Sequence, residues 1–168
     1  RRVPGGGGAL TAGASPGAIV RQPDVPHGPT TLLLADVPQL KDGVASAPLL
    51  IAAASGGPGW RSAALFVMSD GGEATPIGRS APRAVMGVVD AALPSGSIMM
   101  VDRENMLVVR LLADDMDLLS SDEAGLAQGR NFCLVGRELI QFEQAVRTGI
   151  ATYRLSGLRR GLRGTDWA

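Results

Sequence analysis

Apolar runs separated by glycine- and proline-rich breaks predict short β-strands along most of the chain. Thr31–Val37 (TLLLADV) is the first apolar run of strand length, and Pro38 ends it. Residues 48–54 (PLLIAAA) and 60–68 (WRSAALFVM) form two further runs. Apolar runs of this length that are bounded by turn-forming residues are typical of strands. We therefore expect three strands before residue 69.

A tight hairpin is predicted where the third run ends, at residues 69–72 (SDGG). Asp-Gly supplies the positive φ that short hairpin turns require, and residues 75–79 are the returning strand. The phrase also resembles the Asp-box turn of sialidase-like propellers, which leaves a carbohydrate-recognition loop at Asp70 open beside a plain hairpin. Trp60 is then either a stacking platform for a sugar, because its face is large and apolar, or an anchor of the core.

The middle of the chain is predicted to hold further strands. Residues 83–93 (RAVMGVVDAAL) favour a strand over a helix because β-branched residues occupy the centre of the run. Residues 97–101 and 106–112 flank a predicted four-residue hairpin turn at 102–105 (DREN).

One helix is expected at residues 114–129. Ser120 followed by Glu123 forms a capping box, and Gly129 suits the position just after a helix end. A glycosidase needs two carboxyl groups that face each other across a cleft, whereas the carboxylates of this segment gather at one helix start. We therefore assign them to capping.

Three runs near the C-terminus predict an antiparallel meander. They span residues 132–135, 138–145 and 150–155, with turns at 136–137 and 147–149. Period-two alternation divides their side chains between two faces. The set expected on a buried face comprises Phe142, Tyr153 and Leu155. The set expected to face water or a partner comprises Glu143, Thr152 and Arg154.

These elements predict a mainly β fold, an antiparallel β-barrel or β-sandwich with hairpins and one short helix. Residues 1–29 are rich in proline and glycine and are expected to form a linker or strap. Residues 30–168 are expected to form one β-domain, and a small inserted β-subdomain around 45–93 is a further option.

Composition narrows the chemistry that this scaffold can carry. The 168 residues are 45% hydrophobic but only 4% aromatic, so the core must be largely aliphatic, and the formal net charge is +0. A neutral chain gives no electrostatic reason to expect nucleic acid or a membrane as partner, so we expect no specific nucleic-acid recognition. The charge is segregated, however. An acidic block at 114–123 and an arginine cluster at 154–163 are either solvated faces or complementary docking surfaces.

The chain also lacks the residue patterns of an enzyme. Cys133 and His27 are the single members of their types, and Cys133 lies in an apolar strand. Methionines near residues 99–106 are interpreted as core filler. We expect no enzyme, no cofactor and no metal site. No apolar run reaches about 18 residues, so no membrane-spanning helix is expected. The start at arginine, without methionine, indicates a piece of a longer polypeptide.

The segment after the meander, LSGLRRGLRGTDW, is expected to be a loop or irregular edge that presents arginines, because its glycines break a helix. Such a segment is a candidate interface, since the arginine fork pairs with carboxylates while its stem packs. The candidate interface residues are Arg154, Arg159, Arg160, Arg163 and Trp167. The acidic block of a neighbour is a plausible partner. The alternative is a solvated loop with one or two ion pairs inside the chain.

Three phrases carry a resemblance to a known family: LLLADVPQLKDG (32–43), GPGWRSAALFVMSDGGEAT (57–75) and ELIQF…YRLSGLRRGLRGTDWA (138–168). In this order they resemble the C-terminal region of the tail-tip host-specificity protein of siphophages and gene transfer agents, a large protein that also bears a TIM barrel. The chain departs from the family pattern after the Asp-Gly-Gly turn. Ala74-Thr75-Pro76 follows there, whereas the family usually has an aromatic residue.

The resemblance implies a structural virion protein, a β-domain like the baseplate hub, working as a homotrimer. Its partners would be other tail-tip, hub and tail-tube proteins, and its place would be the tail tip of a virion assembled in the bacterial cytoplasm. It would contribute to contact with the host envelope, including an outer-membrane receptor, and to DNA delivery. The alternative is a module of the same particle that binds a host-surface glycan through Trp60, Asp70 and Tyr153.

Overall fold

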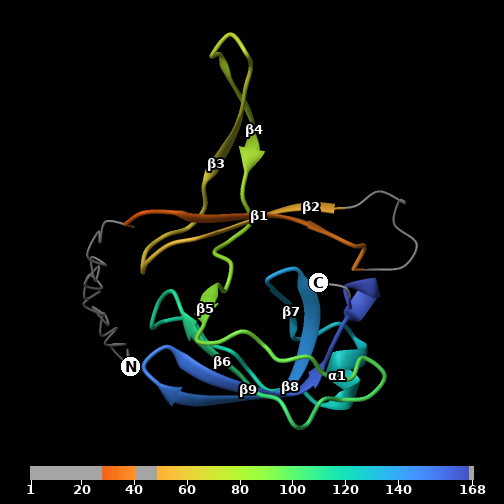
Figure 1. Cartoon of the computed structure of the whole chain (residues 1–168). Helices are drawn as coiled ribbons and strands as arrows, with labels where there is room; N and C mark the ends of the chain where they lie inside the picture. The colour runs from red at the N-terminus through yellow and green to blue at the C-terminus, as the bar shows by residue number, and fades with distance from the viewer. Residues whose placement is uncertain (1–27, 41–48, 167–168) are drawn as a thin grey trace, which may run out of the picture.

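A computed structural model describes residues 28–40 and 49–166, and this part of the chain is mainly β (Figure 1). The strands are β1 (Thr31–Val37), β2 (Leu49–Ser55), β3 (Ala64–Met68), β4 (Ala74–Arg79), β5 (Gly87–Val89), β6 (Leu107–Leu111), β7 (Phe132–Val135), β8 (Glu138–Gly149) and β9 (Thr152–Arg159). A short helix, α1 (Glu123–Ala127), and a 3₁₀ turn, η1 (Leu162–Gly164), complete the elements. Most of the predicted linker, residues 1–27, lies outside the described residues, as do residues 41–48 and Trp167. The prediction of a mainly β, antiparallel fold with one short helix is confirmed.

The largest unit is a five-stranded antiparallel sheet in the order β5-β6-β9-β8-β7. It curls around its own apolar face into a half-barrel whose two edge strands are β5 and β7 (Figure 1). The sheet face that points inward carries the core, together with residues of the loop before α1. The buried core residues are Leu107, Val109, Leu111, Ala113, Met116, Ile140, Phe142, Ala151, Tyr153, Leu155 and Leu158.

The predicted alternation in the meander is confirmed at its centre. Phe142, Tyr153 and Leu155 are 3%, 3% and 2% exposed. Tyr153 lies opposite Val109 of β6, and Leu155 lies opposite Leu107. Because side chains of a strand alternate between faces, the register of β9 against β6 fixes which residues enter the core.

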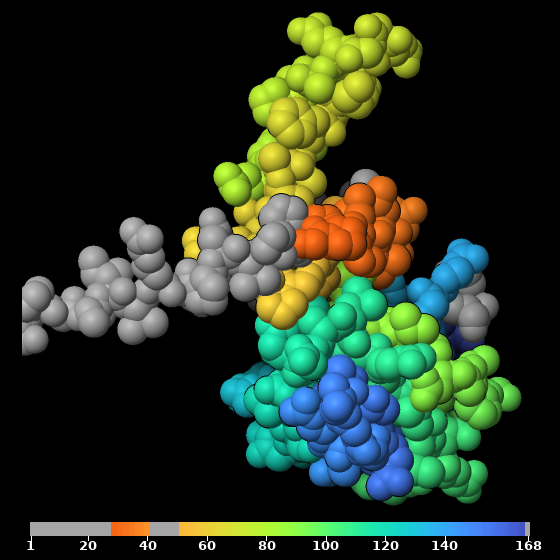
Figure 2. All heavy atoms as spheres, turned by 90° about the vertical axis from the view of Figure 1, so that its left-hand side faces the viewer, coloured from red at the N-terminus to blue at the C-terminus, as the bar shows by residue number. Residues whose placement is uncertain are grey.

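Two separate two-stranded ribbons, β1–β2 and β3–β4, lie outside this sheet. The β1–β2 ribbon crosses the open side of the half-barrel, and the β3–β4 hairpin projects away from both (Figures 1 and 2). The amide of Ala84, just before β5, donates to the carbonyl of Ala54 at 2.9 Å, which ties the ribbon to the start of the half-barrel. The predicted SDGG turn is confirmed: the Gly72 amide donates to the Ser69 carbonyl at 2.8 Å, and Gly72 has a φ of 79°.

The predicted hairpin around residues 102–105 is wrong. Asp102 instead forms an isolated antiparallel bridge with Leu158, through backbone hydrogen bonds of 2.7 and 2.9 Å. The Asp102 carboxylate accepts from the backbone amides of Glu104 and Asn105, which closes a local turn that directs the chain away from a hairpin with β6. In the neighbouring prediction at 83–93, only Gly87–Val89 forms a strand.

The helix is shorter than predicted and has a different N-cap. Asp122 is the N-cap and accepts from the Gly125 amide at 2.9 Å. The Ser120 hydroxyl is engaged elsewhere, because it accepts from the Ala145 amide of β8 at 3.0 Å. Gly129 follows the helix end with a φ of 86°, as predicted. In the described part of the chain, no helix is long and apolar enough to cross a membrane.

Two boundaries in the C-terminal meander also differ from the prediction. β8 runs on to Gly149, so the turn falls at Ile150 and Ala151, where Ala151 has a φ of 53°. β9 continues to Arg159, so Leu158 is a strand residue and fully buried. The predicted arginine loop therefore begins only after the strand ends.

Candidate functional site

The three predicted glycan-binding residues lie in three different places. Trp60 is 7% exposed, and its indole NH donates to the Thr30 hydroxyl at 2.9 Å. Its ring also packs against Gly56, where an added Cβ would lie 2.5 Å from Trp60 Cδ1. Asp70 is exposed at the tip of the β3–β4 hairpin, at the far end of the molecule from β9 (Figure 1). No shared surface brings them together.

Tyr153 is a core residue with a polar tip. It is 3% exposed, and its hydroxyl donates to Asp117 Oδ1 at 2.6 Å. This hydrogen bond, together with burial, raises the pKa of Tyr153 above its usual value. The Arg147 guanidinium lies 5.9 Å from the centre of its ring. The ring is therefore buried and has no open face on which a sugar could stack.

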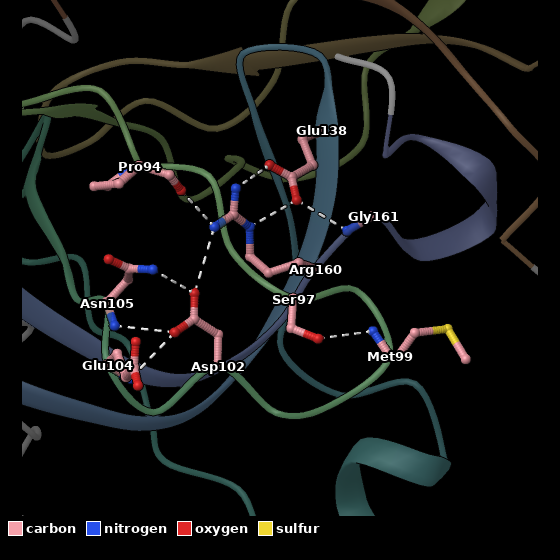
Figure 3. A network of polar contacts seen from close by, with 9 residues as sticks. All are labelled: Pro94, Ser97, Met99, Asp102, Glu104, Asn105, Glu138, Arg160 and Gly161. Carbon is pink, nitrogen blue, oxygen red and sulfur yellow. Dashed lines mark hydrogen bonds and ion pairs between the residues drawn. The ribbon is translucent and has the colours of Figure 1, made fainter.

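Arg160 forms the centre of a buried polar network (Figure 3). Its side chain is 7% exposed and meets Glu138 in a two-pronged ion pair, Nε to Oε1 at 2.7 Å and Nη2 to Oε2 at 2.8 Å. Its Nη1 donates to the Pro94 carbonyl at 2.8 Å and lies 3.5 Å from Asp102 Oδ2. The Gly161 amide also donates to Glu138 at 2.9 Å. We call Arg160, Glu138 and Asp102 the Arg160 network.

The two carboxylates of the Arg160 network are held in their charged form. The Arg160 hydrogen bond lowers the pKa of Glu138, against the effect of burial. Burial alone would raise the pKa of Asp102, but donors on Asn105 and Glu104 and the charge of Arg160 bring it below its usual value. The hydrogen bonds to Glu138 raise the pKa of Arg160 above its usual value. The Arg160 network therefore joins the start of β8, the loop after Pro94 and the end of β9.

The other predicted interface arginines lie at or near the surface. Arg154 is exposed on β9, and Arg163 is exposed in η1, where it donates to the Leu40 carbonyl at 2.9 Å. Arg159 pairs with Glu123 of the acidic block of its own chain. The block forms two further internal ion pairs, Arg83 with Asp115 and Arg147 with Asp117. Trp167 lies outside the described residues.

The projecting β3–β4 hairpin, residues 64–79, exposes apolar side chains, and we call it the arm (Figure 2). Phe66 lies opposite Pro76, and Met68 lies opposite Ala74. Residues that face each other across a hairpin share a face, so these four side chains make one apolar face. Phe66 is 54% exposed and Met68 is 63% exposed. A two-stranded hairpin is marginally stable by itself, so its exposed apolar face is a candidate contact surface.

A groove lies on another side of the molecule, between β1, the β7–β8 turn and η1. It has a volume of about 550 Å³. Its lining combines leucines with charged side chains, and we call it the β1 groove. The lining residues that matter for its chemistry are Leu33, Leu34, Asp36, Leu134, Arg137 and Arg163.

Sequence reasoning predicted the hairpin of the arm but not its isolation, and it did not predict the β1 groove. One signal could have pointed to the arm: β3 reads ALFVM, with apolar residues at every position, beside a turn with no helix to cover it. Among the described residues, no group of three or more metal-ligating side chains is found.

Comparison with known proteins finds one family. Residues 84–168 match the family model described as "Rcc01698-like, C-terminal". The match covers just over half of the 168 residues and includes the whole half-barrel from β5 to η1 and the whole Arg160 network. The β1–β2 ribbon and the arm precede it. No curated protein matches the chain.

Proposed function

The chain belongs to the Rcc01698-like, C-terminal family, and on that premise we propose that it is a structural component of a phage-like particle, a hub-type β-domain at the tail tip or baseplate. The observation that carries this proposal is the arm, whose apolar face stands clear of the domain that bears it. Soluble monomers rarely expose such surfaces, because burying them is favourable by about 25 cal/mol per Å². A domain that presents one is suited to assembly.

The proposed role is mechanical. The half-barrel, whose distant segments are held together by its core and by the Arg160 network, serves as the rigid body. The arm and the exposed arginines Arg154 and Arg163 are the parts that reach other subunits. The assembly is a homotrimer that contacts other tail-tip, hub and tail-tube proteins and takes part in envelope contact and DNA delivery. Its place is the virion tail tip, after assembly in the bacterial cytoplasm.

Within this role, Arg160 does not belong to the contact surface, because its guanidinium is hydrogen-bonded to Glu138 and Pro94 inside the domain. Charge reversal of the interface arginines should therefore be confined to Arg154 and Arg163. A variant carrying both Arg154→Glu and Arg163→Glu keeps the Arg160 network, and it removes the hydrogen bond from Arg163 to the Leu40 carbonyl as well as reversing the two charges.

The test is the molar mass of the chain in solution, measured by light scattering over a range of concentrations. We expect a trimer that dissociates on dilution. The double charge-reversal variant should dissociate at higher concentration than the original chain. A strict monomer at all concentrations would contradict the proposed assembly.

A further inference from the structure

We propose that the arm of one copy docks in the β1 groove of the next copy, with the acidic arm tip against the arginines of the groove. This contact rests on the proposed assembly of several copies and specifies how they join. It uses two surfaces of the same chain that serve no internal contact with each other.

The arm supplies an apolar face and a negative tip. Phe66, Met68, Ala74 and Pro76 form the face, and all four are exposed. The tip carries Asp70 and Glu73, both exposed, while the one basic residue of the arm, Arg79, lies at its base and donates to Ser62. The outer part of the arm therefore carries two negative charges and no positive one.

The β1 groove supplies the complementary chemistry. Leu33 of β1 is 45% exposed, and with Leu134 it forms the apolar part of the groove. Arg137 and Arg163 line it from the β7–β8 turn and from η1, and both are exposed. The charged side chains of the lining are these two arginines and Asp36. Opposite charge across an interface favours the correct register and speeds association.

The arm cannot reach the groove of its own chain, because it projects away from the half-barrel and from the β7–β8 turn (Figures 1 and 2). The groove that receives it must belong to another copy. A contact between two different patches of the same protein is head-to-tail, and such contacts build rings when the rotation closes. The arm and the β1 groove thus give each copy one donor surface and one acceptor surface.

The apolar part of the contact is tested by comparing the two faces of the arm. Phe66→Asp places a charge on the apolar face, and we expect it to weaken association about tenfold or more, as for a central interface residue. Val67→Asp is the matched control, because Val67 is 53% exposed, close to the 54% of Phe66, but points to the opposite face of the same strand. Both residues are exposed, so the midpoint of unfolding should stay unchanged in both variants.

The polar part is tested by a charge swap. Asp70→Arg with Glu73→Arg should weaken association, because the arm tip then repels the groove. Adding Arg137→Glu and Arg163→Glu should restore it. Association is measured by sedimentation equilibrium at two salt concentrations, since salt screens exposed charges and should shrink both effects.

The outcomes separate the docking from the proposed function. Two results together support the docking. Phe66→Asp weakens assembly while Val67→Asp does not, and the groove substitutions Arg137→Glu and Arg163→Glu restore the assembly that Asp70→Arg with Glu73→Arg weakens. Assembly that is insensitive to Phe66→Asp overturns it and leaves the proposed trimer in place. If Phe66→Asp weakens assembly but the groove substitutions fail to compensate the arm-tip substitutions, the β1 groove is not the receiving site. A chain that stays monomeric overturns the docking and the proposed assembly together.

Discussion

Arg160 links three segments that lie far apart in the sequence, because its guanidinium contacts Glu138, Pro94 and Asp102. A buried guanidinium is tolerated only when its donors are matched, and here Glu138 takes two of them while Pro94 and Asp102 meet a third. The fork geometry of arginine suits this arrangement, whereas a lysine would offer only a point charge. Arg160 therefore holds the loop after Pro94 against the sheet.

Replacing Arg160 with methionine should destabilise the domain severely. The substitution keeps much of the stem but leaves the carboxylates of Glu138 and Asp102 without their cation, which costs about 3–5 kcal/mol for a buried pair. Arg154→Met is the matched control, because Arg154 is exposed and its loss should change stability by about 0.5 kcal/mol or less. Urea denaturation measures both. Equal midpoints for the two variants would show that the Arg160 network contributes little.

The same carboxylates predict the pH dependence of stability. The pKa values of Asp102 and Glu138 are lower in the folded chain than their usual values. Below about pH 5 the unfolded chain therefore binds more protons than the folded one, and the free energy of unfolding falls as the pH falls. This contribution is fully present at neutral pH and is lost progressively as the pH falls through the lowered folded-state pKa values of Asp102 and Glu138.

The measurement is the free energy of unfolding at several pH values between about 6 and 2.5. Asp102→Asn should reduce the slope in the acid range, because one of the two shifted groups is gone. An unchanged slope would mean that carboxylates outside the Arg160 network dominate the acid response.

At the scale of elements, β9 does more than pair with its neighbours. It pairs with β6 and with β8, and beyond Ser156 it bends to form the bridge between Leu158 and Asp102. Gly157 lies at the bend with a φ of 65°, opposite Glu143. Glycine in a strand marks such bends in curled sheets.

Gly157→Ala should therefore be costly. A left-handed φ costs about 1–2 kcal/mol for an alanine, and the new Cβ would lie 2.9 Å from the Cβ of Glu143, which adds a steric term of about 1–3 kcal/mol. Gly136→Ala measures the backbone cost alone, because Gly136 has a φ of 62° and nothing lies within 4 Å of an added Cβ. Thermal unfolding of both variants gives the comparison. A larger loss at Gly136 than at Gly157 would contradict this account.

Elements with local boundaries could be predicted from sequence, and those set by distant partners could not. The predicted bounds of β1 and β7 match the structure because Pro38 and Gly136 stop the strands locally. The turn at Asp102 was predicted wrongly because its strand partner, Leu158, lies far along the chain. Ser120 offered a good capping signal, but β8 uses its hydroxyl and Asp122 caps the helix instead.

The candidate site divides in the same way. Period-two alternation correctly buries Tyr153, yet the same rule cannot show that Trp60 is covered by Gly56 and Thr30. The arginine-rich phrase drew attention to Arg160, but no local pattern distinguishes it from the exposed Arg163. The difference arises only when the sheet brings Glu138 beside the end of β9.

At the scale of the whole molecule, the half-barrel and the arm differ in how they are stabilised. The half-barrel has a continuous buried core and the Arg160 network. The arm has two short strands and an exposed apolar face. Local stability follows buried apolar contact, so the two parts should open with very different free energies.

Hydrogen exchange should resolve this difference. In the dilute chain, amides of β3 and β4 should exchange much faster than those of β8 and β9. At concentrations where copies associate, the arm should gain protection while the half-barrel changes little. Arm amides as slow as those of β8 in the dissociated chain would show that the arm is stable without a partner.

The strand order has a consequence for how the domain is made. β9 is the last strand in the described part of the chain, yet it lies at the centre of the five-stranded sheet. On the ribosome, β5–β6 and β7–β8 can form only as two unconnected pairs while β9 is still inside the exit tunnel. The five-stranded sheet, its core and the Arg160 network can therefore be completed only when β9 and Arg160 have emerged. The domain therefore cannot reach its complete fold on the ribosome until β9 and Arg160 have left the exit tunnel.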